Sequence, residues 1–227
     1  MREADLVTLA ETILRAGQKQ LLRAFSRSAL TDTFYLTGGT ALAAFHLGHR
    51  VSDDLDFFTE RDVPVEAVLE FLRGLAMGIP QYQHLFDLRI FVLPGAPEGP
   101  LKVEFTRYPF TRCESGREVD GVRVDSLRDI LANKLLALTE RSEPKDFVDL
   151  YFGLRARGAP EIEALVDDAE RKFGVRGVRH MLRARFIGAL PPLGGLEMRA
   201  AVDPAEVQRF FSETASRWVR ESLDEGD

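Results

Sequence analysis

The sequence predicts an α/β (α+β) core with a mixed sheet over residues 1–125, followed by a helical half over residues 126–227. Two observations carry this prediction. Short apolar runs bounded by glycine, proline or polar residues are typical of strands, and all of them lie before residue 125. Beyond that point apolar residues recur at helical spacing over longer segments.

The same patterns place the individual elements. We expect strands at 34–37, 55–58, 85–93, 101–106 and 121–124, with a polar loop or hairpin at 111–120. In the first part of the chain, helices are expected at 4–26, 40–47 and 65–76. In the second part they are expected after a cap at Asp125 or Ser126, from Pro144, and near 160–173, 175–187 and 204–222.

Composition narrows the class of protein. With 45% hydrophobic residues among 227, the chain can bury a core, so a disordered protein is excluded. Thirty basic and 36 acidic residues give a net charge of −6, which argues against a general nucleic-acid coat. Cys113 is the single cysteine, so no internal disulfide or cysteine-based zinc site can form. We expect no membrane segment, no signal peptide and a cytoplasmic location.

One stretch, residues 34–60, combines two features that together suggest a phosphate and metal site. Gly38 and Gly39 follow a predicted strand and open a helix, where backbone N–H groups can approach an anion. Asp54 and Asp56 lie two residues apart at the next strand, so their carboxylates point to one side. Carboxylate oxygens on one side of a strand suit a hard divalent cation.

This stretch resembles the nucleotidyltransferase superfamily, in which two small residues precede an Asp-x-Asp strand. Its form, GGTAL followed by R-x-S-x-D-x-D, resembles the AbiEii/AbiGii toxin family; the matching residues are Arg50, Ser52, Asp54 and Asp56. A second block resembles the same family: it comprises Lys134, Arg141, Lys145, Asp146, Asp149 and Leu150. The resemblance covers residues 34–60 and 101–152, and it implies a nucleotidyltransferase-type core.

The resemblance also implies roles for single residues. Asp54 and Asp56, with a third carboxylate on a neighbouring strand, would hold Mg²⁺ or Mn²⁺; Glu104 is the best placed candidate for that third ligand. The β- and γ-phosphates would be cradled by Gly38, Gly39 and Thr40, with a hydrogen bond from Ser52. Arg50 and Lys134 would stabilise the pyrophosphate leaving group. Lys134 and Asp146 would belong to the catalytic residues.

Several of these residues have a simpler interpretation. Glu104 is also what an exposed strand glutamate opposite a basic partner looks like, and Lys102 beside it is either such a neighbour or a phosphate contact. Lys134 lies among leucines, where its stem can pack while the ammonium reaches solvent. Because methionine keeps most of the packing of the stem, Lys134→Met should hold stability within about 1 kcal/mol or improve it, while transfer should drop by orders of magnitude if Lys134 is catalytic. Lys145 and Asp149 can form a surface ion pair.

The predicted function is an Mg²⁺-dependent transfer of a nucleoside monophosphate from a nucleoside triphosphate to an acceptor. The family resemblance implies an RNA acceptor such as a tRNA 3′ end, and a toxin with an antitoxin encoded nearby. A basic helical face at Arg176, Arg179 and Arg183 is either a solvated surface or a surface that binds the phosphate backbone of RNA. The alternatives are a small-molecule, antibiotic-type nucleotidyltransferase and a non-catalytic nucleotide-binding regulator.

Overall fold

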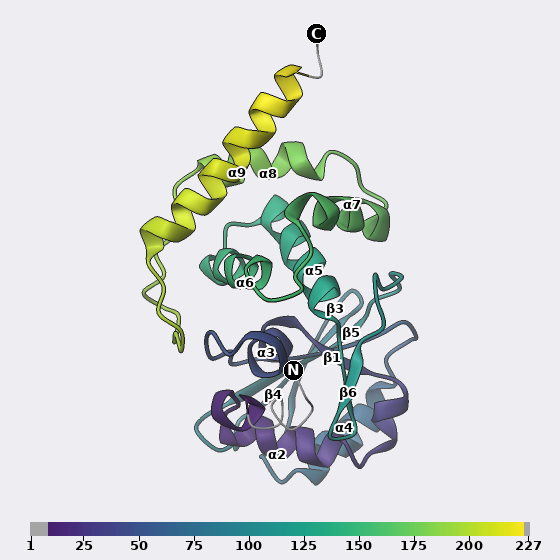
Figure 1. Ribbon diagram of the computed structural model, residues 1–227. Helices are drawn as coiled ribbons and strands as arrows, with labels where there is room; N and C mark the ends of the chain where they lie inside the picture. The colour runs from purple at the N-terminus through teal and green to yellow at the C-terminus, as the bar shows by residue number, and fades with distance from the viewer. Residues whose placement is uncertain (1–8, 225–227) are drawn as a thin grey trace. The chain divides into compact units, whose positions relative to one another are not determined.

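The structure, a computed structural model, describes residues 9–224, and its contacts divide the chain into two compact units (Figure 1). The first unit ends at Ser126 and contains every strand among the described residues. The second starts at Leu127 and is built from helices.

The first unit is organised by a mixed seven-stranded sheet with the order β3-β4-β5-β2-β1-β7-β6. Its strands are β1 (Tyr35–Thr37), β2 (Leu55–Thr59), β3 (Gln81–Leu85), β4 (Leu88–Leu93), β5 (Leu101–Arg107), β6 (Arg117–Val119) and β7 (Val122–Val124). The pairs β2–β5 and β1–β7 are parallel, and the other neighbours are antiparallel. The mixed sheet predicted from the sequence is therefore confirmed.

The two faces of the central strands differ in character. On one face Phe57 of β2 stacks on Phe105 of β5, and Phe25 packs on Phe57 with ring centroids 4.4 Å apart. Phe25 ends α2 (Ala16–Phe25), which covers this face together with α4 (Val65–Gly74) (Figure 1). On the opposite face the same two strands carry Asp56 and Glu104. The alternation of buried and half-buried residues along β2 and β5 is what the strand period predicts.

A short helical segment follows β1 and connects it to the loop before β2. It begins as α3 (Gly38–Leu42) and continues as η2 (Ala43–Leu47), a π-helical turn, until Gly48 adopts a left-handed conformation. The helix expected at 40–47 is thus confirmed with an earlier start. This unit also contains the short element η1 (Ala29–Asp32) and a helical segment at 9–13.

Two expectations for this unit were wrong in detail. The strand expected at 85–93 is a hairpin, because Phe86 adopts a positive φ of 50° and reverses the chain between β3 and β4. The helix expected at 4–26 is interrupted at Leu14 and Arg15, and α2 begins at Ala16. The portion of that helix before residue 9 lies outside the described residues.

The second unit contains α5 (Leu127–Glu140), α6 (Pro144–Leu154), α7 (Ile162–Phe173), α8 (Val178–Ile187) and α9 (Pro204–Asp224). Helix α9 lies along α8, and Trp218 stacks on Phe186 in the core between them (Figure 1). Asp203 caps α9 as predicted, since its carboxylate accepts from the Ala205 amide at 2.9 Å. Within residues 9–224, no helix is long and apolar enough to cross a membrane.

Candidate active site

The polar face of the sheet brings the predicted carboxylates together. Asp56 pairs with Glu104 in the parallel register of β2 and β5, so the two side chains emerge side by side on one face. Asp54 immediately precedes β2 and lies two residues before Asp56, which places it on the same side. The strand position on which the choice of Glu104 rested is confirmed, and its metal-binding role stays a prediction.

The diglycine is required by what packs against it. Gly38 has a φ of +72°, and a Cβ at this position would overlap the carboxylate of Asp56. A Cβ at Gly39 would lie 2.8 Å from both Arg50 Nη2 and Ser52 Oγ. A side chain at Gly38 or Gly39 would therefore displace the side chains of three predicted site residues, Asp56, Arg50 and Ser52.

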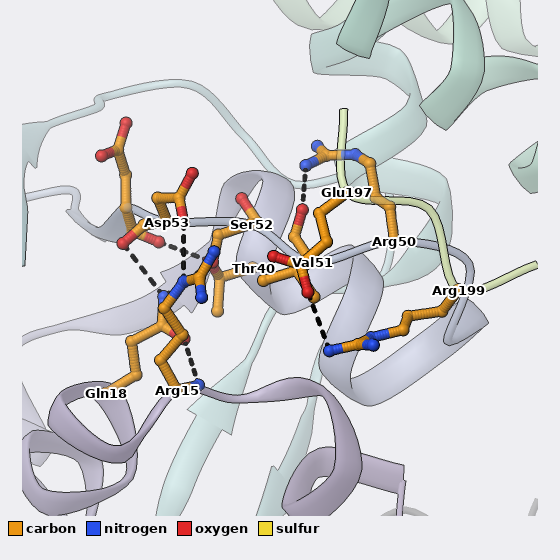
Figure 2. A network of polar contacts seen from close by, with 10 residues as sticks. Arg15, Gln18, Thr40, Arg50, Val51, Ser52, Asp53, Glu197 and Arg199 are labelled. Atoms are coloured by element: carbon orange, nitrogen blue, oxygen red, sulfur yellow. Dashed lines mark hydrogen bonds and ion pairs between the residues drawn. The ribbon is translucent and has the colours of Figure 1, made fainter. Parts of the chain in front are cut away.

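The loop that leads to Asp54 is fixed by hydrogen bonds from two helices (Figure 2). Thr40 of α3 is buried, and its hydroxyl donates to the carbonyl oxygen of Asp54. From the other side Gln18 of α2, only 1% exposed, donates from Nε2 to the carbonyl oxygens of Ser52 at 2.8 Å and Asp53 at 3.1 Å. Arg15 adds an ion pair from Nε to Asp53 Oδ1 at 2.8 Å. Because the Thr40 hydroxyl is used in this way, Thr40 holds the loop in place.

Lys102 lies between two of the predicted metal ligands. Its Nζ is 3.1 Å from Asp54 Oδ2 and 2.6 Å from Glu104 Oε1. Burial alone would lower the pKa of Lys102, but the bond to Glu104 and the charge of Asp54 outweigh that effect and raise it. Among residues 9–224, no three or more His, Cys, Asp or Glu side chains are grouped so that they could hold a metal ion as they stand. Asp54 and Glu104 nevertheless converge on a cation, the ammonium of Lys102.

A neutral histidine follows the diglycine helix. His46 in η2 makes a hydrogen bond from Nε2 to the carbonyl oxygen of Asp125 at 3.0 Å, and its Nδ1 lies 3.2 Å from Arg117 Nη2. Burial, reinforced by the charge of Arg117, lowers the pKa of His46 to about 4. Since Nδ1 faces an arginine donor, the neutral tautomer carries its proton on Nε2. Asp125 also accepts from the hydroxyl of Thr37, at the end of β1.

The second unit contains the other predicted catalytic pair, and it is buried. Lys134 of α5 donates from Nζ to Asp146 Oδ1 at 2.7 Å and lies 2.8 Å from Asp149 Oδ2; both carboxylates are 0% exposed. Arg141 Nε bonds the second oxygen of Asp146 at 2.8 Å. Burial alone would lower the pKa of Lys134, but the charges of Asp149 and Asp146 outweigh that effect and raise it. The structure thus brings Lys134 and Asp146 into contact, and their catalytic role stays a prediction.

This geometry rejects two of the simpler interpretations. The ammonium of Lys134 does not reach solvent to be hydrated, because it is buried against two aspartates. Asp149 is not a surface partner of Lys145, because its carboxylate is buried and faces Lys134. The basic helical face predicted at Arg176, Arg179 and Arg183 is only partly on a helix, because α8 begins at Val178, after Arg176. Arg179 is also engaged: it pairs with Glu221, and its guanidinium lies over the Trp218 ring.

Three residues at these sites were missed or left open by the sequence. Asp149 has the spacing of a surface ion pair, and Gln18 lies in an amphipathic helix 34 residues before the loop it holds. No local pattern marks Gln18. Asp149 belongs to the block that resembles the family, but its contact with Lys134, like that of Gln18 with the loop, depends on how separate elements pack. Lys102 was recognised as a neighbour of Glu104, but its bond to Asp54 requires the β2–β5 register.

Comparisons with known proteins identify the family of this chain. Residues 20–219 match the family described as the nucleotidyl transferase AbiEii toxin of type IV toxin–antitoxin systems. An uncharacterized protein of Aquifex aeolicus is 33% identical over 166 residues, which is 70% of this chain and 77% of that protein.

Solved structures share the fold at low sequence identity. JHP933 from Helicobacter pylori superposes with a TM-score of 0.58 at 18% identity, covering 92% of each chain. MenT4, a nucleotidyltransferase toxin from Mycobacterium tuberculosis, superposes with a TM-score of 0.50 at 18% identity, covering 96% of this chain and 93% of that one. The fold class predicted from the sequence, a nucleotidyltransferase-type core with a helical C-terminal half, is confirmed.

Proposed function

Because this chain belongs to the AbiEii nucleotidyl transferase toxin family, we propose that it transfers a nucleoside monophosphate from a nucleoside triphosphate to RNA, such as a tRNA 3′ end. Membership in this family makes the chain a nucleotidyltransferase, which disfavours the non-catalytic regulator considered from the sequence. The observation that supports the proposal best is the joint placement of Asp56 beside Glu104 and against Gly38.

The donor set on the sheet fits a divalent cation. Asp54, Asp56 and Glu104 offer carboxylate oxygens on one face, the ligands that Mg²⁺ and Mn²⁺ prefer, and two of them already share a cationic group. When bound there, Mg²⁺ would neutralise the triphosphate and polarise its phosphoryl oxygens.

The surrounding residues supply the remaining contacts to the nucleotide. Backbone N–H groups of Gly39 and Thr40 lack helical partners at the start of α3 and can donate to phosphate oxygens. Arg50 and Ser52, which pack against Gly39, are suited to the same phosphates. Lys134 and Asp146 are proposed as further catalytic residues by family resemblance, and their mutual bond fixes the orientation of both.

Nucleotide transfer with a labelled α-phosphate tests the proposal. The purified protein is incubated with Mg²⁺ and each nucleoside triphosphate in turn, in the presence of total tRNA or of hydroxyl-bearing antibiotics. We expect label on tRNA with the parent protein and none with Asp54→Asn. Label on the antibiotics alone would favour the small-molecule enzyme, and label on neither would contradict both.

The proposed biological setting is a toxin that acts on RNA in the cytoplasm, where nucleoside triphosphates and tRNA are available, with an antitoxin encoded nearby. The family description supports a toxin–antitoxin context for this chain. Growth arrest on expression of the parent but not of Asp54→Asn, relieved by co-expression of the neighbouring gene, would support both parts. Growth that continues with the parent would count against the toxin.

A further inference from the structure

Lys102 is built into the acidic face of the sheet. Lys102 and Glu104 lie two residues apart on β5 and therefore share a face, and the register that pairs Leu55 with Val103 brings Asp54 opposite Lys102. The ammonium is within bonding distance of both carboxylates. The pairing of two central strands therefore places Lys102 on the same face as the predicted metal ligands.

The acidic face of the sheet carries a net negative charge. Three carboxylates, Asp54, Asp56 and Glu104, carry a formal charge of −3, and Lys102 reduces the sum to −2, which one divalent cation balances. In two-metal sites a pair of ions about 3.5–4 Å apart clamps the attacking and leaving oxygens. Here one of the two positive centres is already supplied by the chain, because Asp54 and Glu104 are both bonded to the same ammonium.

We propose that Lys102 is a resident cation which takes the place of a second divalent ion, so that this site binds one divalent cation per chain. This inference rests on the proposed metal site. Lys102 remains 39% exposed, so its ammonium can donate to a phosphate oxygen while the carboxylates bind the single ion. The ammonium also competes with that ion for Asp54 and Glu104 and thereby weakens its binding.

Counting bound Mn²⁺ tests this role without relying on activity. Free Mn²⁺ is measured by electron paramagnetic resonance during titration of the intact protein, with a non-hydrolysable nucleoside triphosphate analogue. We expect one ion per chain for the parent. Lys102→Met keeps most of the length of the side chain and removes the charge, so it should bind a second ion and bind the first at least fivefold more tightly.

Two variants make the result specific. Lys102→Arg retains the charge and should bind one ion, like the parent. Arg107→Met removes a charge from the same strand, but Arg107 faces Asp62 and Asp87 and not the acidic face, so Mn²⁺ binding should be unchanged. Thermal melts confirm that each variant is folded, and Lys102→Gln replaces the methionine variant if that one is not.

The outcomes separate this inference from the proposed function. If the parent binds Mn²⁺, Asp54→Asn abolishes that binding, and Lys102→Met matches the parent in number and affinity, the role of Lys102 is overturned and the metal site stands. If the parent binds two ions, the proposal that Lys102 takes the place of a second metal ion is likewise wrong. If neither the parent nor Lys102→Met binds Mn²⁺ above the level of Asp54→Asn, the metal site itself is wrong and this inference falls with it.

Discussion

Two lysines in this chain each lie between two carboxylates, and their surroundings differ. Lys102 contacts Asp54 and Glu104 on the open face of a sheet, where its side chain is 39% exposed. Lys134 contacts Asp146 and Asp149 inside a helical unit, where its side chain is 10% exposed and both carboxylates are fully buried. The bond lengths are similar, so burial is the variable that separates the two clusters.

Burial decides what each cluster can do. Water and dissolved ions can replace an exposed ion pair, which typically contributes about 0–1 kcal/mol to stability. A buried pair cannot be exchanged in this way, and removal of one partner leaves a charge without compensation, at a cost of about 3–5 kcal/mol. The cluster on the sheet is therefore suited to exchange its lysine contacts for a ligand, and the helical cluster is suited to hold its own members in place.

The largest expected effect is on catalysis at the exposed cluster. Asp54→Asn and Asp56→Asn should each reduce nucleotide transfer at least 10³-fold, about 4 kcal/mol of transition-state stabilisation, because the proposed metal loses a ligand. Stability without metal should change by less than about 1 kcal/mol. Single-turnover transfer and thermal melts measure the two quantities, and the variants should also lose the melting shift that Mg²⁺ and nucleotide give the parent.

The control is the neighbouring Asp53→Asn. Asp53 is an aspartate in the same loop as Asp54. Its side chain is 76% exposed and pairs with Arg15, so it does not belong to the acidic face. Its transfer rate should match that of the parent within a factor of two or so. Equal losses at all three aspartates would indicate that these changes disturb the loop as a whole, and the assignment of Asp54 and Asp56 would be wrong.

The next effect is on stability at the buried cluster. Lys134→Met removes the cation shared by Asp146 and Asp149, so the free energy of unfolding should fall by about 3–5 kcal/mol, as measured by urea denaturation. This replaces the change of less than about 1 kcal/mol that the sequence alone suggested. Lys145→Met on α6 is the control, with a change of at most about 0.5 kcal/mol. Equal stability of the two variants would mean that the aspartates find other partners.

The sequence predicted the elements of the exposed cluster far better than those of the buried one. Gly38, Gly39, Asp54 and Asp56 lie within 19 residues, and their chemistry depends on local turns and on the strand period. The buried cluster depends on how α6 packs against α5. The spacing of Lys145 and Asp149 equally fits a surface pair, and only the packing turns Asp149 inward.

The hairpin β3–β4 was missed for a related reason. Phe86 is not a typical turn residue, and the single Asp87 after it does not interrupt the apolar run from Leu85 to Leu93 enough to suggest two strands. In the structure the reversal is fixed by the five paired residues on each side of it, so cross-strand pairing determines the turn despite an unfavourable positive φ at Phe86.

A smaller effect should arise from the support of the Asp54 loop. Gln18→Leu removes both hydrogen bonds to the loop carbonyls, which should cost about 1–2 kcal/mol of stability and reduce transfer about tenfold as Asp54 loses its position. The control is Gln20→Leu on the same helix, because Gln20 donates to the carbonyl of Leu75, away from this loop. Urea denaturation and transfer rates should show a stability loss for both and an activity loss for Gln18→Leu alone. Full activity of Gln18→Leu would show that Gln18 is not needed to position Asp54.

The smallest effect is a loss of stability in mild acid. It should arise from His46, in the helical segment that follows the diglycine, and not from the two lysine clusters. The pKa of Lys102 and that of Lys134 are raised, so both stay charged below pH 7. The pKa of His46 is about 4 in the folded chain against 6.5 for the ordinary group, so the unfolded state binds more protons between these values. The stability from His46 is complete above pH 6.5 and should fall by about 1 kcal/mol between pH 6.5 and 5.5.

Urea denaturation at pH 6.5 and 5.5, with matched histidine variants, measures the contribution of His46 to this loss of stability. His46→Gln keeps an amide that can donate to the Asp125 carbonyl but cannot be protonated, so its stability should fall less than that of the parent over this interval. His180→Gln, at an exposed position of α8 in the second unit, is the matched control and should keep the decline of the parent. If the stability of both variants declines as much as that of the parent, the acid sensitivity belongs to other groups. Protonation of His46 then costs little, because Asp125 or solvent accommodates its charge.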